Sequence, residues 1–145
     1  MVETRPDTIN RTNLVFLRKL GCTKIQIGVQ SLSPEVLKAC GKMDSNGKTP
    51  IENIVNAFSL LREFGFKSHC HFMLNLPQSM PENDKQDYIK LVSDKRFLPD
   101  EIKIYPCSLV AGTQLEQMYK QNSWQPYSET QLLDVLSDNI LNTPR

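Results

Sequence analysis

Short apolar segments alternate with longer amphipathic segments along the whole chain. Residues 2–4, 24–29, 68–74 and 102–105 carry short apolar or alternating runs, a pattern typical of strands. Elsewhere apolar residues recur at helical spacing, around residues 14–20, 51–61, 82–92, 115–119 and 128–140. Strands that alternate with helices in this order predict βαβ units with a parallel sheet and right-handed connections. Four strands are too few for a closed barrel of eight, so we predict an α/β fold, a partial (β/α) TIM-like barrel with its helices outside.

The boundaries of several helices are marked by their sequence. Ser33 followed by Pro34 predicts a helix start. The spacings Thr49 to Glu52 and Ser128 to Gln131 each predict a capping box. In the last helix we expect the inner face to comprise Leu132, Leu133, Leu136 and Ile140.

Composition limits the classes of protein that fit. The 145 residues carry 17 basic and 16 acidic side chains, a net charge of +1, which argues against nucleic-acid binding by this stretch alone. No apolar run approaches the roughly 18 residues of a membrane span, and no signal peptide is recognisable, so we expect a cytoplasmic protein without membrane contact. The four cysteines share no repeated spacing and are interpreted as reduced thiols: Cys22, Cys40, Cys70 and Cys107. Both ends interrupt the pattern, so we expect a longer parent protein.

Polar residues follow or end the predicted strands. Parallel α/β proteins place their working residues at the carboxyl ends of strands. These ends supply a carboxylate, amides, imidazoles and a cation, a set that suits a ligand with a ribose and an amino-acid tail. The residues are Glu3, Gln30, Ser31, His69, His71, Asn75, Lys103 and Tyr105.

Six blocks of sequence carry a resemblance to a known family. In order they are VETRPD at 2–7, LGCTKIQIGVQS at 20–31, His71 with NLP at 75–77, PD at 99–100, IKIYP at 102–106 and GT at 112–113. The chain resembles the catalytic subunit family of Elongator, whose radical S-adenosylmethionine (radical SAM) core and acetyltransferase domain modify the wobble uridine of tRNA. The GVQS and LP blocks are more distantly similar to oxygen-independent coproporphyrinogen oxidases.

The resemblance implies the activity, the cofactors and the extent of the domain. Residues 1–145 correspond to the C-terminal half of the radical SAM core, with the cluster loop and any acetyltransferase domain outside the chain. The full-length protein is expected to bind S-adenosylmethionine and a [4Fe–4S] cluster, to act on tRNA, and to use acetyl-CoA as acetyl donor.

The resemblance also implies roles for individual residues. Glu3 corresponds to the carboxylate that holds the amino group of the methionine moiety, and Gln30 to the glutamine that hydrogen-bonds the ribose. His71 occupies the position of an aspartate that reaches the ribose in the porphyrinogen oxidases. Lys42 is the candidate for the methionine carboxylate, although a lysine offers a point charge where arginine offers a fork. Lys103 and Tyr105 lie on the strand expected to flank the adenine.

The family's Cys-x-x-x-Cys-x-x-Cys loop and glycine-rich strand have no counterpart in the sequence. We therefore expect this chain to be unable to bind the cluster, to be inactive alone and to bind S-adenosylmethionine weakly. A half-barrel with open edges is expected to self-associate. Alternatives are a noncatalytic barrel piece acting as scaffold or tRNA-docking module, a coproporphyrinogen-oxidase-like radical SAM protein, and a different α/β barrel enzyme with a phosphate site. His69 and His71 share a strand face and supply only two ligands of a metal site, which needs three or four.

Overall fold

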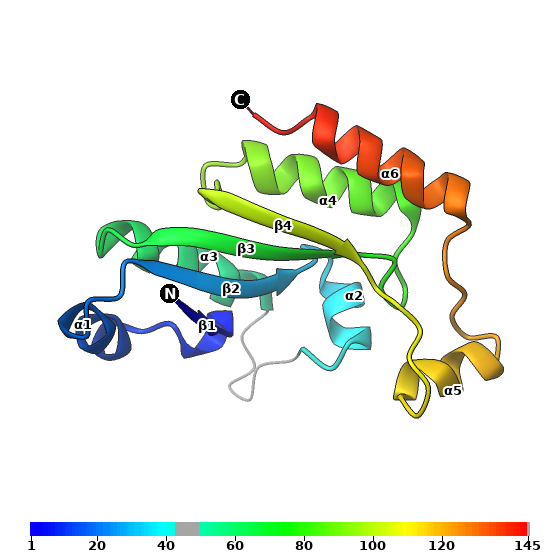
Figure 1. Cartoon of the computed structure of the whole chain (residues 1–145), viewed down its shortest axis with the longest axis horizontal. Helices are drawn as coiled ribbons and strands as arrows, with labels where there is room; N and C mark the ends of the chain where they lie inside the picture. The colour runs from blue at the N-terminus through cyan, green and yellow to red at the C-terminus, as the bar shows by residue number, and fades with distance from the viewer. Residues whose placement is uncertain (43–49, 145) are drawn as a thin grey trace.

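A computed structural model describes residues 1–42 and 50–144, and its core is a parallel sheet with helices packed against one side (Figure 1). The described strands are β1 (Val2–Thr4), β2 (Lys24–Gln30), β3 (Lys67–Leu74) and β4 (Glu101–Pro106), in the spatial order β1-β2-β3-β4. All three pairings are parallel. The prediction of an α/β fold with parallel strands is confirmed.

Helices connect the strands and extend the chain after β4. They are the 3-10 helix η1 (Pro6–Thr8), α1 (Arg11–Lys19), α2 (Pro34–Ala39), α3 (Pro50–Glu63), α4 (Pro81–Ser93), α5 (Gln114–Lys120) and α6 (Glu129–Leu141). None of the described helices is long and apolar enough to cross a membrane.

The two faces of the sheet differ in chemistry because side chains alternate along each strand. Ile25, Ile27 and Phe72 belong to one buried apolar cluster with Phe58 of α3 and Tyr88 of α4. On the opposite face, which we call the polar face, two rows of residues lie in register across the strands. The first row is Glu3, Gln26, His69 and Glu101, and the second is Gly28, His71 and Lys103. Core and polar chemistry are thus carried by opposite sides of the same strands.

Helix capping follows the sequence signals wherever the structure describes them. The Ser33 hydroxyl accepts the backbone N–H of Val36, and Ser128 and Gln131 form both bonds of a capping box. Thr49 lies outside the described residues, so the capping box expected there has no described counterpart.

The expected inner face of α6 is wrong at two positions. Leu133 and Ile140 are 57% and 66% exposed, whereas Val135 and Asn139 are completely buried. Leu132 and Leu136 do pack against the core. The stripe that faces the core therefore runs through residues 132, 135, 136 and 139. The hydrophobic pattern did not reveal this face because one of its members, Asn139, is polar.

Arg18, near the end of α1, links this helix to the residues that follow α3. Its Nε and Nη2 donate to the Phe64 carbonyl at 3.0 and 2.8 Å, and its Nη1 donates to the Cys22 carbonyl at 3.2 Å. The guanidinium carbon lies 4.0 Å from the centre of the Phe66 ring. These contacts need the planar guanidinium group with its several N–H donors, and a lysine ammonium does not have this geometry.

We expect Arg18→Lys to lower the free energy of unfolding by about 1–3 kcal/mol, because carbonyl oxygens that are partly buried lose their donors. Urea denaturation followed by circular dichroism measures this change. Arg96→Lys is the matched control, since Arg96 pairs with Asp94 on the surface with 58% of its side chain exposed, and its loss should stay below about 1 kcal/mol. Equal losses in both variants would contradict the role assigned to Arg18.

Candidate functional site

Three residues from three strands meet on the polar face. The Tyr105 hydroxyl of β4 lies 3.1 Å from Nδ1 of His71 on β3. The same Nδ1 is 3.7 Å from Oε1 of Glu3, which reaches it from β1. The Glu3 side chain is 63% exposed, whereas that of His71 is 8% exposed. An accessible carboxylate therefore borders a buried imidazole.

Lys103 adds a cation to this group. Its Nζ lies 5.5 Å from the centre of the Tyr105 ring, within the range of a cation–π interaction. Among the described residues Lys103 has no carboxylate partner. The four predicted site residues Glu3, His71, Lys103 and Tyr105 are thus brought together.

Burial sets the protonation states of His71 and Tyr105. Desolvation lowers the pKa of His71 below its ordinary value; Lys103 and His69 lower it further, and Glu3 opposes the shift. Desolvation raises the pKa of Tyr105, and the charge of Glu3 adds to this effect. At neutral pH a neutral imidazole therefore pairs with a protonated phenol. Nε2 of His71 is buried without a hydrogen-bond partner in the part of the chain that the structure describes.

Gln30 has a strained backbone at the end of β2. Its φ is 70°, in the left-handed region, and the register of β2 with β3 shifts between Gly28 and Gln30. Within the described residues its side chain makes no hydrogen bond, although the amide is a strong donor and acceptor. Such strain away from glycine is concentrated at binding and active sites.

Gln26 orients Glu3 and was not among the residues singled out from the sequence. Its Nε2 donates to Oε2 of Glu3 at 2.7 Å, and Gln26 is only 7% exposed. Because Gln26 holds Oε2, the other oxygen of Glu3, Oε1, is directed toward His71. Strand alternation, which puts residues 26 and 28 on one face, was the available signal.

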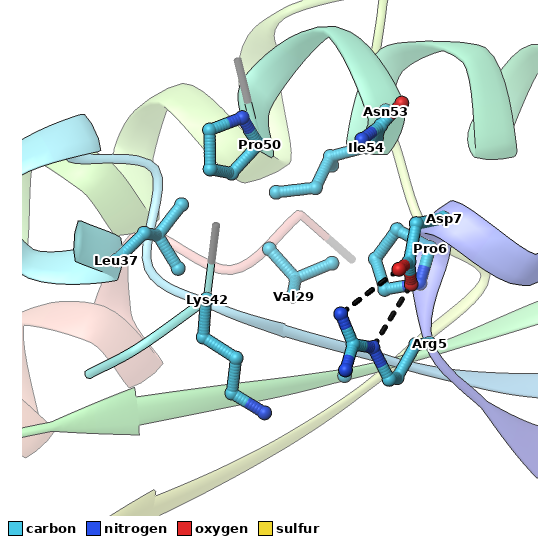
Figure 2. Close-up of a pocket in the computed structure, with 10 residues that line it drawn as sticks. Arg5, Pro6, Asp7, Val29, Leu37, Lys42, Pro50, Asn53 and Ile54 are labelled. Atoms are coloured by element: carbon cyan, nitrogen blue, oxygen red, sulfur yellow. Dashed lines mark hydrogen bonds and ion pairs between the residues drawn. The ribbon is translucent and has the colours of Figure 1, made fainter. Parts of the chain in front are cut away.

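Lys42 lies in a neighbouring pocket, apart from the four clustered residues. Figure 2 shows this pocket between the end of β1, the end of β2 and helices α2 and α3. Arg5 also lines it, but its guanidinium is held by Asp7 at 2.9 and 2.8 Å. Lys42 has no ion pair with a described residue. Gly28 lines the same pocket and stands beside His71 in the sheet.

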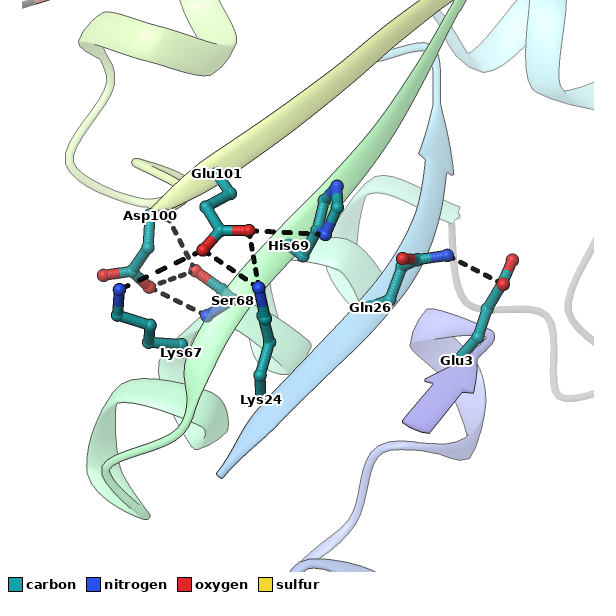
Figure 3. Close-up of polar contacts among 8 residues, drawn as sticks. All are labelled: Glu3, Lys24, Gln26, Lys67, Ser68, His69, Asp100 and Glu101. Atoms are coloured by element: carbon teal, nitrogen blue, oxygen red, sulfur yellow. Dashed lines mark hydrogen bonds and ion pairs between the residues drawn. The ribbon is translucent and has the colours of Figure 1, made fainter. Parts of the chain in front are cut away.

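A second polar group lies nearer the amino ends of the strands (Figure 3). Lys24 donates to both oxygens of Glu101 at 3.0 and 2.8 Å, and Nδ1 of His69 lies 3.6 Å from the same carboxylate. The hydrogen bond from Lys24 is the main cause that lowers the pKa of Glu101. Within the described residues no three His, Cys, Asp or Glu side chains converge on a metal position. His69 therefore lies beside the Lys24–Glu101 ion pair, and its ring also meets that of His71 edge-on, with the centroids 5.6 Å apart.

Asn75 and Ser31, proposed from their place at strand ends, are used to hold the structure. Ser31 donates its hydroxyl to Asp87 at 2.9 Å. The Asn75 N–H donates to Asp84 at 2.9 Å, and its carbonyl accepts the Trp124 indole N–H at 3.2 Å.

The amide side chain of Asn75 is also hydrogen-bonded at both its oxygen and its nitrogen. Its Oδ1 accepts the Tyr127 backbone N–H at 3.1 Å, and its Nδ2 donates to the Cys107 carbonyl at 3.4 Å. Asn75 thus fastens both ends of the excursion formed by residues 107–127.

The thiols do not suit an iron–sulfur cluster. Cys22 and Cys70 are buried, Cys40 and Cys107 are half-buried, and all four are free. Burial raises the pKa of the Cys40, Cys70 and Cys107 thiols, which keeps them protonated. Metal ligation requires thiolates, and no group of three converges among the described residues.

Comparison with known proteins decides the family. The family model of the radical SAM superfamily matches residues 1–90, and that of the radical SAM C-terminal domain matches residues 99–145. The chain belongs to the radical SAM superfamily. Its parallel sheet and flanking helices are therefore part of the radical SAM fold.

Two curated relatives match almost the whole chain. The tRNA uridine(34) acetyltransferase of Methanocaldococcus infernus is 36% identical over 136 residues, 94% of this chain and 24% of the relative. Elongator complex protein 3 of Saccharomyces cerevisiae is 32% identical over 143 residues, 99% of this chain and 25% of the relative. The chain thus spans about a quarter of the length of these relatives, and the resemblance to the Elongator catalytic subunit family is confirmed.

Two solved structures share the fold. The archaeal Elp3 of Methanocaldococcus infernus lacking residues 1–46 superimposes with a TM-score of 0.89 at 35% identity, over 98% of this chain and 32% of that one. The coproporphyrinogen III oxidase of Escherichia coli superimposes with a TM-score of 0.72 at 22% identity, over 96% of this chain and 30% of that one. The second likeness shows the fold of a radical SAM enzyme.

The Glu3–His71 contact predicts the direction of a measurable change. We expect His71 to titrate below the ordinary value of about 6.5, and Glu3→Gln to lower its pKa further because the stabilising carboxylate is lost. Since the folded state disfavours protonated His71, stability should decrease as the pH falls below about 6.5. NMR titration of the imidazole resonances measures the shift. Glu63→Gln, on an exposed ion pair with Arg11, is the control; an unchanged or higher His71 pKa in Glu3→Gln would contradict the contact.

Proposed function

We propose that residues 1–145 form the C-terminal half of the radical SAM core of a cytoplasmic tRNA wobble-uridine-modifying enzyme that uses acetyl-CoA as acetyl donor. The names of the relatives, tRNA uridine(34) acetyltransferase and Elongator complex protein 3, support the substrate class. The observation that carries the proposal is the accessible Glu3 carboxylate beside neutral His71, with strained Gln30 at the end of the adjacent strand.

The site residues suit the separate parts of S-adenosylmethionine. Glu3 accepts hydrogen bonds from the ammonium group of the methionine moiety, and Lys42 pairs with its carboxylate. The free amide of Gln30 and the neutral imidazole of His71 bond the ribose hydroxyls, while the edge of Tyr105 and the Lys103 stem border the adenine. Because Gln26 already holds one oxygen of Glu3, the carboxylate is oriented before the ligand arrives.

The iron–sulfur cluster belongs to another part of the full-length protein. The bound cofactor supplies radical chemistry in this superfamily once a cluster delivers an electron. The thiols of this chain do not fit such a cluster, because no three converge among the described residues and burial keeps those of Cys40, Cys70 and Cys107 protonated. We therefore expect the chain alone to bind S-adenosylmethionine weakly and not to cleave it.

The deciding experiment uses the full-length protein that contains this chain, reconstituted with iron and sulfide without oxygen. We expect 5′-deoxyadenosine to form from S-adenosylmethionine, and Glu3→Gln and Gln30→Ala each to reduce its rate roughly 10- to 100-fold, the loss of one hydrogen bond to a charged or buried group. Gln117→Ala, on the exposed surface of α5, is the matched control and should leave the rate unchanged.

The outcomes separate the candidate functions. Cluster absorbance without 5′-deoxyadenosine, or no cluster in any preparation, would contradict the enzyme and favour a noncatalytic scaffold or tRNA-docking module. Equal rates in all variants would overturn the residue assignments while leaving the enzyme class intact.

We further propose that the chain alone associates with copies of itself through the outer side of β1 and α1. Among the described strands β1 pairs with β2 alone. Beside it lies a groove lined by apolar side chains, and Phe16 and Leu20 of this region are 60% and 66% exposed. An unpaired strand edge next to exposed apolar surface favours pairing with another chain.

We expect light scattering to show a mass that rises with concentration, and Phe16→Glu to shift the chain toward monomer by placing a charge in the contact. Leu133→Glu on α6, at a similarly exposed apolar position, is the control and should not change the mass. A monomer at every concentration would overturn this proposal.

A further inference from the structure

We propose that His69 is a positioning residue for the candidate site: it holds a proton beside Glu101 and thereby extends to lower pH the range in which its neighbour His71 stays uncharged. Burial already favours the neutral form of His71, and a charge on His69 adds to that preference. The consequence for the ligand rests on the proposed function, because it concerns the availability of the Glu3 carboxylate to a cationic group.

The two imidazoles lie on one face of β3. They are two positions apart in the strand, so their side chains point to the same side of the sheet. The ring centroids are 5.6 Å apart, and the ring planes make an angle of 68°. Two cations at this separation repel each other, so the pair holds one proton more readily than two. The surroundings of the two rings decide which of them takes the first proton.

The surroundings of His69 favour a positive charge. Its register partner on β4 is Glu101, and Oε2 of that carboxylate lies 3.6 Å from Nδ1 of His69. This Nδ1 is buried and makes no hydrogen bond with any residue that the structure describes. On β2 the register partner is Gln26, which is uncharged. A proton on Nδ1 of His69 therefore faces a carboxylate.

Two lysines also contact Glu101 and keep it ionised (Figure 3). Lys24 donates to both carboxylate oxygens at 3.0 and 2.8 Å, and Nζ of Lys67 lies 4.0 Å from Oε1. The hydrogen bond from Lys24 is the main cause that lowers the pKa of Glu101, and the charges of His69 and Lys67 add to it. The Lys67 side chain is 66% exposed, so water screens its charge from His69.

The surroundings of His71 disfavour a positive charge. Its register partner on β4 is the cation Lys103, and β2 contributes only a glycine beside it. The His71 side chain is 8% exposed, compared with 17% for His69. Desolvation lowers the pKa of His71 most, Lys103 and His69 lower it further, and Glu3 opposes the shift. The first proton therefore goes to His69.

A proton on His71 would change what a ligand meets at the site. In the neutral imidazole, Nδ1 lies 3.1 Å from the Tyr105 hydroxyl and can accept its O–H. A protonated imidazole donates from both nitrogens, and Oε1 of Glu3 lies 3.7 Å from Nδ1. Glu3 would then pair with His71 and not with a cationic group of the ligand. By taking the proton first, His69 keeps the Glu3 carboxylate available.

NMR titration of the imidazole resonances between about pH 5 and pH 8 tests this order of protonation. The sequence contains two histidines, so His69→Gln and His71→Gln each leave one imidazole and assign the signals. In the wild type we expect the His69 resonances to respond before those of His71 as the pH falls. His69→Gln should raise the pKa of His71, because a neighbouring cation is lost. His69→Lys keeps a cation at this position and should leave the pKa of His71 as low as in the wild type.

The consequence for the ligand is measured in the full-length protein that contains this chain, reconstituted with iron and sulfide. Equilibrium dialysis gives the affinity for S-adenosylmethionine at about pH 6 and pH 8. We expect His69→Gln to bind severalfold more weakly than wild type at the lower pH and equally well at the higher pH. His69→Lys should match the wild type at both. Glu63→Gln, on the exposed ion pair with Arg11, is the control and should also match it.

Each outcome identifies what fails. An unchanged or lower pKa of His71 in His69→Gln would overturn the inference, and so would equal shifts in His69→Gln and His69→Lys, which would indicate packing and not charge. The expected NMR shift with equal affinities at about pH 6 would reject the consequence for Glu3. A wild type that binds no S-adenosylmethionine at either pH would overturn the proposed function, while the NMR titration still decides the role of His69. If His69→Gln does not fold, the wild type decides: His71 responding before His69 would reject that role.

Discussion

The hydrogen bonds of Asn75 hold the segment of residues 107–127 to the carboxyl end of β3. Its backbone N–H binds the buried carboxylate of Asp84, while its carbonyl and amide side chain bind Trp124, Tyr127 and Cys107. Asparagine tolerates the left-handed backbone that this position requires, with φ at 62°. Asp84 is 2% exposed, and burial raises the pKa of its carboxyl although Ser79, Asn75 and Tyr127 donate to it. One residue after β3 therefore ties down both ends of the excursion that runs from the end of β4 to the start of α6.

The site follows from the same architecture. Parallel strands deliver Glu3, His71 and Tyr105 to one face without any of them entering the apolar layer. Burial of His71 between its neighbours, and not a charged partner, sets its neutral state, since desolvation dominates the shift of its pKa. Glu3 and Lys103 place opposite charges beside the neutral pair formed by His71 and Tyr105. The polar face therefore suits a ligand whose uncharged polar part is flanked by charged groups.

Local sequence signals predicted most helices and strands because helix capping and the alternation of apolar residues depend on residues close together in the chain. Ser33 and Ser128 cap the helices that follow them, and the apolar runs became strands. The inner face of α6 was wrong because a buried Asn139, whose amide has no partner among the described residues, cannot be recognised by hydrophobicity. Glu3, His71, Lys103 and Tyr105 lie together on the polar face, but His71 and Lys103 stand within their strands and not, as the sequence had suggested, at the ends. The pairing of Gln26 with Glu3 depends on which strands become neighbours. Asn75 and Ser31 show the opposite case. Their positions after strands predicted ligand-binding residues, whereas in the structure their hydrogen bonds hold neighbouring segments together.

The alternation along β3 separates two kinds of sequence change. His69 and His71 stand on the polar face, while Cys70, Phe72 and Leu74 are fully buried on the other. Substitutions at the two histidines can therefore alter ligand chemistry with the apolar layer left in place. Loss or gain of one residue within β3 would instead exchange the faces, and bring imidazoles into the core and a phenylalanine into the site. Lineages of this fold can thus diversify in activity by point substitution, whereas their strands should keep a fixed length and their loops absorb the insertions.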